Sequence, residues 1–257
     1  MDVVVCVKQI PPDDAWALDD ATLTLKRGGK LILDESDTYG VEMALQLVEA
    51  AGGGTVSLVS MSPGEDQSGL RQALAMGAAE AILVSDPALA GTDALGTARV
   101  LAAAISRRSP DLVLTATESS DGYTGTVPVQ LAELLGLPAV TFAKSVAIDD
   151  GTVKVDRQTE EGYDEVTCPL PALVSVTAGV VQPRYPSFKG IMAAKSKPVE
   201  ELTVADLGLD GQVGWAGGGQ EIVGATPAEA REAGEIIEDD GEGYLKIVQF
   251  LEGLKVI

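Results

Sequence analysis

The chain has 257 residues, enough for one large or two small domains with a buried core. It carries 39 acidic and 18 basic residues, a net charge of −21, and no histidine. Because proteins bind nucleic acids largely through Lys and Arg that neutralise phosphates, this charge excludes a DNA or RNA binder. At 46% hydrophobic and 22% charged residues, the composition is that of an ordinary globular protein.

Strand-like and helix-like stretches alternate along the first two thirds of the chain. Runs dominated by β-branched residues predict strands buried on both faces at 3–7, 55–60, 81–85, 112–116, 139–142 and 172–176. Helical patterns, three of them ended by glycines, occur at 37–51, 66–76, 93–107 and 126–135. We therefore expect an α/β fold with a doubly wound, mostly parallel sheet.

Two segments interrupt this alternation as expected β hairpins. One covers 23–33 around Gly28-Gly29, and the other is an excursion at 144–168 that turns at 149–151.

The pattern changes again after residue 199. A glycine-rich stretch is followed by an expected helix from Pro227 to about residue 236 and by an amphipathic helix at 244–251. We expect two parts: an α/β domain at 1–200 and an extended C-terminal linker and helical arm at 201–257. The arm either folds back on its own domain or packs on a partner.

Residues 166–199 contain no Asp or Glu, which is unusual in so acidic a chain. Pro183 and Pro186 each fix φ and remove a backbone donor, so we expect a surface loop here, with Phe188 near its tip. An exposed aromatic flanked by basic residues has the composition of an interface anchor. Alternatively, Phe188 folds back onto its own core; spacing alone leaves both open.

No catalytic or metal site stands out. Histidine is absent, Cys6 and Cys168 form no CxxC pair, and Arg27-Gly28-Gly29-Lys30 lacks the spacing of a phosphate-binding loop. The sequence thus predicts no catalytic residue, no metal ligand and no enzyme. We also find no leader-like start and no stretch of about 20 apolar residues, so we expect a cytoplasmic protein without membrane insertion.

Three loops follow predicted strands at their carboxyl ends, where parallel sheets bind ligands: 8–13, 61–64 and 117–125. The last is rich in small hydroxyl residues and glycine, and it leads into a helix whose free amides could hold a phosphate. Taken alone, this loop could equally be a capped helix start without a ligand.

Several stretches in order resemble the electron transfer flavoprotein β subunit. They are Val5-Cys6-Val7-Lys8-Gln9, Leu112-Val113-Leu114, Val155-Asp156-Arg157, Leu170-Pro171-Ala172, and residues 71–78, 131–136 and 183–192. The resemblance implies an adenine nucleotide α hydrolase-like fold. It also implies AMP bound in this subunit, and FAD shared with the α subunit, which holds most of it. The C-terminal arm at 201–257 would pack on that partner subunit.

Carried over by position, the implied cofactor-binding residues fall in five places along the chain. The redox flavin would approach residues 8–13, the region of Ser36 and Arg157. The full set is Cys6, Asp34, Glu35, Ser36, Asp37, Met61, Ala116, Thr117, Glu118, Ser119, Ser120, Asp121, Gly122, Tyr123, Thr124, Gly125, Thr126, Val127 and Arg157.

The resemblance also implies a function. Such a subunit carries electrons without bond-making catalysis of its own, from flavin dehydrogenases such as the acyl-CoA dehydrogenases of fatty acid oxidation to a quinone-linked oxidoreductase. Clients would dock on the segment at 183–197, through Arg184, Phe188, Lys189, Ile191, Met192 and Lys195.

Two departures and two alternatives accompany this reading. Glu118 stands where the family commonly has an amide, and its carboxylate would repel a phosphate; Gln158 stands where an acidic residue would form an inter-subunit ion pair. One alternative is a bifurcating carrier with a second FAD in place of AMP. The other is a stand-alone adenine-nucleotide-binding protein on the same fold.

Overall fold

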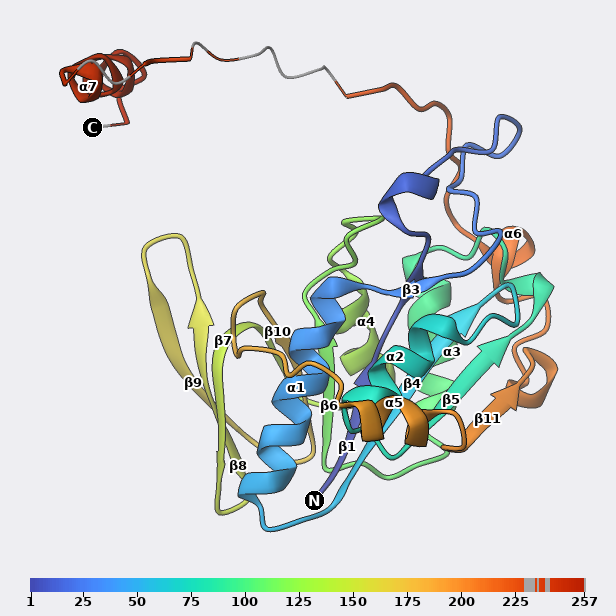
Figure 1. Cartoon of the computed structure of the whole chain (residues 1–257). Coiled ribbons are helices and arrows are strands. Elements are labelled where there is room, and N and C mark those ends of the chain that lie inside the picture. The colour runs from blue at the N-terminus through green and yellow to red at the C-terminus, as the bar shows by residue number, and fades with distance from the viewer. Residues whose placement is uncertain (229–233, 235, 239–240, 257) are drawn as a thin grey trace. The chain divides into compact units, whose positions relative to one another are not determined.

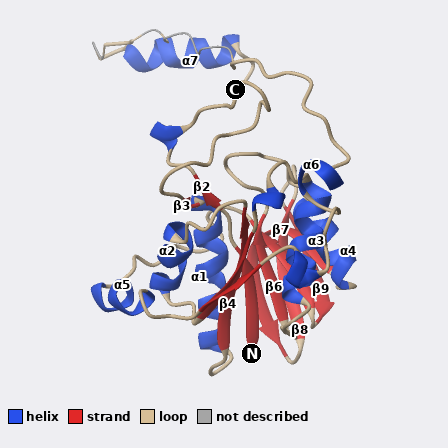
Figure 2. Cartoon of the chain, turned by 90° about the vertical axis from the view of Figure 1, so that its right-hand side faces the viewer, coloured by secondary structure: helices blue, strands red, loops and turns tan. Residues whose placement is uncertain are grey.

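The structure is a computed structural model, and it describes residues 1–228, 234, 236–238 and 241–256. Two compact units emerge, Met1–Ile222 and Val223–Ile257. The larger unit is a three-layer α/β domain, with helices on both faces of one central sheet (Figures 1 and 2). The expected α/β fold with a mostly parallel sheet is confirmed.

Nine strands form the sheet in the order β11-β5-β4-β1-β6-β10-β7-β8-β9. Pairing is parallel from β11 to β7 and antiparallel through β8 and β9. The bounds are β1 (Asp2–Cys6), β4 (Thr55–Ser62), β5 (Glu80–Ser85), β6 (Leu112–Ala116), β7 (Ala139–Asp149), β8 (Thr152–Gln158), β9 (Tyr163–Pro169), β10 (Ala172–Val176) and β11 (Val199–Leu202). The strand order reverses at β1, which lies between β4 and β6 and therefore marks the switch point.

The core has two layers because the central strands bury both faces. One layer packs under α1 (Glu35–Ala50) and α2 (Ser68–Met76), and the other under α3 (Ala94–Ile105) and α4 (Val127–Leu135). Alternate residues of β1 divide between them: Val3 and Val5 join the first layer, and Val4 and Cys6 the second. This explains the unbroken apolar runs of the central strands.

The hairpin expected at 23–33 is wrong. Short strands β2 (Gln9–Ile10) and β3 (Ile32–Leu33) pair with each other instead, and residues 11–31 form a long loop containing the short helix η1 (Asp13–Ala15). The arginine beside the two glycines bonds outside the loop: Arg27 donates to the backbone oxygen of Gln9 and to Asp121. These tertiary contacts replace the cross-strand pairing that the glycines suggested.

The excursion at 144–168 has three strands. β7 continues from the parallel sheet through a register shift near Phe142 and turns at 149–152 as expected. β8 then turns again at 159–162, where the amide of Gly162 donates to the hydroxyl of Thr159, and returns as β9.

Residues 201–222, which the sequence assigned to the C-terminal part, pack with the larger unit. β11 extends the sheet, and Leu202, Val204 and Val213 are buried in the second core layer. Two adjacent glutamates, Glu200 and Glu201, interrupt the apolar pattern and hid this strand.

Short helices η2 (Pro87–Leu89), η3 (Ala205–Leu207) and α6 (Gly214–Gly217) complete this unit together with α5 (Phe188–Ala194). In the smaller unit, α7 (Gly243–Gly253) matches the expected last helix, whereas most of the helix expected at 227–236 lies outside the described residues. Within the described part of the chain, no helix has the length and apolar character needed to span a membrane.

Candidate functional site

A cavity of about 1080 Å³ opens at the carboxyl ends of β1, β4 and β6, at the switch point of the sheet. Cys6, Met61 and Thr115 line it from these three neighbouring strands. The amino-terminal turns of α3 and α4 add further wall, including Thr97 and Val127. The long loop at 11–31 lies at the same end of the sheet (Figure 1). The volume of the cavity is that of a site for a cofactor-sized molecule.

Most of the expected cofactor-binding residues meet at this cavity. Those that line it are Cys6, Asp37, Met61, Ala116, Thr117, Glu118, Ser119, Asp121, Thr124, Gly125 and Val127. Ser120, Gly122, Tyr123 and Thr126 belong to the same loop, and Asp34, Glu35 and Ser36 start α1 beside it, but none of these is a lining residue. Arg157 is exposed on β8, opposite Ala143 and Asp164, and the structure does not bring it to the cavity.

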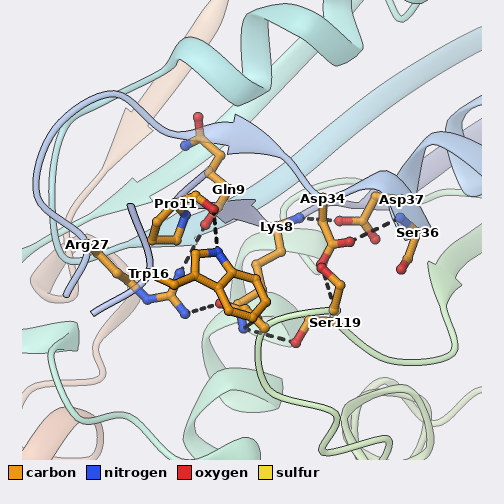
Figure 3. Close-up of polar contacts among 11 residues, drawn as sticks. Lys8, Gln9, Pro11, Trp16, Arg27, Asp34, Ser36, Asp37 and Ser119 are labelled. Carbon is orange, nitrogen blue, oxygen red and sulfur yellow. Dashed lines mark hydrogen bonds and ion pairs between the residues drawn. The ribbon is translucent and has the colours of Figure 1, made fainter. Parts of the chain in front are cut away.

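Asp34 holds three segments together (Figure 3). Its carboxylate accepts the amide of Ser36 at 3.0 Å, capping α1, and the amide of Ser120 at 2.8 Å. Its own amide donates to the backbone oxygen of Lys8 at 3.0 Å. Asp34 is fully buried, and its hydrogen bonds position the ligand loops. Its carboxylate therefore serves the fold.

Asp121 joins two of the three cationic residues that line the cavity, Lys8 and Arg27. Lys8 Nζ contacts its carboxylate at 2.6 Å and Ser119 Oγ at 3.1 Å, and the Arg27 guanidinium pairs with the same carboxylate (Figure 3). Burial opposes ionisation of Asp121, but Lys8 and Arg27 outweigh it and lower the pKa of this carboxyl group. One buried carboxylate thus pairs with two cations, so the group formed by these three side chains keeps a net positive charge.

Asp37 and Cys6 are buried at the inner end of the cavity. Burial raises the pKa of Asp37 well above its usual range, against the hydrogen bond from the Lys8 amide at 2.6 Å; nearby Asp34 and Asp121 raise it further. Burial raises the pKa of the Cys6 thiol, and the nearby Asp37 carboxyl group raises it further. A protonated thiol is a poor nucleophile, so this pair is unsuited to thiolate chemistry.

The remaining polar groups suit binding more than catalysis. Thr126 makes no side-chain cap at the start of α4, and Pro128 in its first turn has no amide, so Val127 and Val129 provide the first amides of that helix. The buried hydroxyl of Thr115 lacks a hydrogen-bond partner within the described chain. Glu118 is exposed at the cavity, and the described residues include no cluster of acidic or cysteine side chains arranged for a metal.

The family model described as the electron transfer flavoprotein domain matches residues 22–207. The chain belongs to this family. It is 40% identical to electron transfer flavoprotein subunit beta of Mycobacterium tuberculosis over 265 residues, covering 99% of each chain. The corresponding subunit of Thermoanaerobacterium thermosaccharolyticum is 36% identical over the full length of both chains. The caffeyl-CoA reductase-Etf complex subunit CarD of Acetobacterium woodii is 37% identical over 81% of this chain and 80% of its own.

In this member of the electron transfer flavoprotein family, part of the expected docking loop is a helix. α5 begins at Phe188 because Ser187 caps it, its hydroxyl accepting the amide of Gly190 at 3.0 Å. The expectation of a loop without helix is therefore wrong from residue 188 onward. Phe188 is 80% exposed, so it does not fold back onto the core. Tyr185, Ile191 and Met192 are also exposed beside it.

Arg184 binds within the chain. Its guanidinium contacts Glu42 at 2.7 and 3.0 Å and Glu49 at 2.9 Å, and its amide also donates to Glu42. Glu42 is buried on α1, so Arg184 ties the segment before α5 to that helix. Lys189 on α5 and Lys195, the residue that follows this helix, are both exposed.

The lining residues that were not expected from the sequence include Trp16, Arg27, Asp93 and Trp215. Arg27 had been set aside because its glycine motif lacks phosphate-loop spacing. Composition gave a signal for Trp16 and Trp215, because the chain has only two tryptophans and both lie in otherwise polar, glycine-containing segments.

Proposed function

We propose that this chain is the β subunit of a cytoplasmic, heterodimeric electron carrier. It would pair with an α subunit, share an FAD with it, and hold AMP in the cavity at the switch point. The carrier would take electrons from flavin dehydrogenases such as acyl-CoA dehydrogenases and pass them to a quinone-linked oxidoreductase. The observation that carries this proposal is the cavity itself, which is lined in part by the loops at 8–13, 61–64 and 117–125 that the sequence predicted to bind a ligand.

The cavity fits an adenine nucleotide in its size and donors. Thr115 offers an unpartnered hydroxyl at the cavity, and the uncapped amides of α4 favour a phosphate. The Glu118 carboxylate disfavours a phosphate at its own position. A phosphate would therefore bind the amides and leave this side chain turned outward.

The polypeptide would supply orientation and electrostatics. Bound FAD supplies the ability to accept and release electrons. At the cavity, burial favours the protonated forms of the Cys6 thiol and the Asp37 carboxyl group, and Asp121 is held in ion pairs with Lys8 and Arg27, so these groups suit binding and orientation.

Client docking would use the exposed apolar surface made by Tyr185, Phe188, Ile191 and Met192, which we call the docking surface. Lys189 and Lys195 border it. An aromatic anchor with a charged rim is a typical arrangement for a small protein contact. Such a contact permits fast exchange among several partners.

A second FAD in place of AMP is the alternative that one observation favours. A volume of about 1080 Å³ lies at the upper end for small-molecule sites and exceeds the needs of a mononucleotide. The likeness to CarD, which belongs to a caffeyl-CoA reductase-Etf complex, points the same way.

One experiment tests the proposal and its alternatives. The chain is co-expressed with the reading frame for its α subunit, and the purified complex is examined by absorption and, after denaturation, by mass spectrometry of released small molecules. A yellow heterodimer releasing one FAD and one AMP is expected. Two FAD would favour the alternative. A colourless monomer that turns over ATP would contradict both and indicate a stand-alone nucleotide-binding protein.

A further inference from the structure

Both tryptophans of the chain line the same cavity. Trp16 comes from the 11–31 loop and Trp215 from α6, more than half the chain apart in sequence. Only 4% of the residues are aromatic, so this convergence gives the cavity a wall that is rare elsewhere in the molecule.

The indole ring of Trp215 packs against a glycine, Gly91. A Cβ atom built on Gly91 would lie 2.1 and 2.3 Å from Cδ2 and Cε2 of Trp215, the two atoms shared by its rings, and 2.6 Å from Cε3. Only a position over the ring face is this close to the fused bond without overlapping other ring atoms. Gly91 therefore packs against one face of the indole, and any side chain at this position would displace it.

The backbone around Trp215 is fixed independently of the indole. The Trp215 amide donates to the Ala90 oxygen at 3.0 Å, and the Gly214 amide to Thr92 Oγ1 at 2.9 Å. The amide of Gly219 donates to Asp93 at 2.8 Å. Three bonds thus hold this segment on the loop between η2 and α3, so the fold does not need the ring to anchor it.

The indole nevertheless remains 52% exposed at the cavity wall. Trp16 is 44% exposed, and its Nε1 already donates to the Pro11 oxygen at 2.9 Å (Figure 3), so its ring is available only for apolar contact. Large, rigid aromatic faces left open in a ligand-sized cavity suit stacking on another planar ring.

We propose that Trp215 is a ligand-specificity residue: its free face stacks on a planar aromatic ring of the nucleotide in this cavity. The inference rests on the proposed function, since it presumes that the cavity binds a nucleotide. The ring is the adenine of AMP or one of the rings of FAD, and the common requirement is a flat π system.

The test uses the full heterodimer, dialysed free of nucleotide and reloaded with one FAD. Calorimetric titrations with AMP, FAD and ribose 5-phosphate are compared for wild type, Trp215→Ala and Trp215→Phe. Tyr163→Ala, which truncates an exposed aromatic on β9, is the matched control. Thermal melts of every variant establish that the complex is folded.

We expect Trp215→Ala to weaken the binding of AMP or FAD by about tenfold or more, in line with the loss of one stacked ring. Trp215→Phe should retain most of the affinity, and the ring-free sugar phosphate should be insensitive to both. A loss for AMP identifies adenine as the stacked ring, and a loss for FAD alone identifies the flavin.

Unchanged binding of both nucleotides by Trp215→Ala overturns the inference and leaves the proposed function intact. Equal losses for Trp215→Ala and Trp215→Phe, or an equal loss for ribose 5-phosphate, also overturn it, because they indicate distortion of the cavity. A wild-type complex that binds neither nucleotide removes the proposed function together with the inference.

Discussion

Arg184 and Phe188 lie close together in the segment at 183–197 but have different roles. Arg184 turns inward and binds Glu42 and Glu49 of α1, while Phe188 points outward at the start of α5. The basic residue that composition placed at an interface thus orients the segment, and the aromatic residue is free to contact a partner. Charge alone does not separate these roles, because an arginine fits equally well in either.

Phe188→Ala should weaken docking to a flavin dehydrogenase by about 2 kcal/mol, the effect of removing an exposed anchor. Folding should be almost unaffected, since Phe188 is 80% exposed. Electron transfer at varied client concentration measures the first effect and thermal unfolding the second. Matched losses of docking and thermal stability would contradict an anchor role, and Tyr163→Ala serves as the control for an exposed aromatic elsewhere.

Asp37→Asn should stabilise the protein increasingly as the pH rises. Burial raises the pKa of Asp37, so the folded chain holds the proton more tightly than the unfolded chain. Wild-type stability therefore falls as pH rises above the ordinary aspartate pKa of about 4 through the raised one. Asparagine cannot ionise but can still accept the Lys8 amide. We expect a gain on the order of 1 kcal/mol at pH 8, vanishing near pH 4.

Denaturant unfolding at several pH values measures this difference. Asp164→Asn, at an exposed position on β9, is the control and should show no such pH trend. A stability loss for Asp37→Asn that is largest at pH 8 would show that the native state needs the ionised carboxylate.

At the scale of elements, α5 depends on close contact with α2. A Cβ atom on Gly190 would lie 2.4 Å from the backbone oxygen of Ala75, a distance that side chains do not adopt. Lys197 strengthens the same junction by donating to the oxygens of Leu74 and Ala78 at the end of α2. The docking surface is therefore built on helix packing, with loop geometry only before residue 188.

Gly190→Ala should displace α5, costing about 1–3 kcal/mol in the free energy of unfolding as other overpacked contacts do. Client docking should weaken as well, although Gly190 carries no side chain for a partner. Gly64→Ala is the control, since a Cβ there meets no atom within 4 Å. If the Gly190→Ala variant kept wild-type stability and docking, α5 would be able to move away from α2 without a cost in the free energy of unfolding.

At the scale of the whole molecule, the cavity and the proposed docking surface lie at opposite ends of the sheet. α2 starts beyond the carboxyl end of β4 and runs back, so its last turn and the attached α5 lie near the level at which β1 begins (Figure 1). A client bound through α5 would consequently leave the cavity end uncovered. This separation suits a carrier that is held at one site while its cofactor region reaches a redox partner.

Ending the chain at Ile222 should abolish stable association with the α subunit. The smaller unit presents exposed apolar residues along α7, including Tyr244, Ile247 and Phe250, and it is too small to bury them by itself. Co-purification and gel filtration with the α subunit measure the effect, and Phe250→Asp provides a milder version. Full retention of the heterodimer after truncation would show that this unit does not contribute to the interface.

The sequence by itself determined the alternating strands and helices, the three strand-end loops that contribute to the cavity, and the family. Those properties depend on local periodicity, capping glycines and short motifs, which are readable within a few residues. Leu112–Ala116 and Ala172–Val176 were predicted with the bounds that the structure has, because unbroken β-branched runs have no competing helical period.

Only the tertiary structure decided which side chains meet. Arg27 reaches Asp121, Arg184 reaches Glu42, and Trp16 and Trp215 converge on one cavity, each across a long sequence separation. Such partners are chosen by how the layers pack and by the need to pair buried charges, and neither is encoded in local spacing. The same reason explains Arg157, which stays on an exposed strand while most of the other predicted residues gather at the cavity.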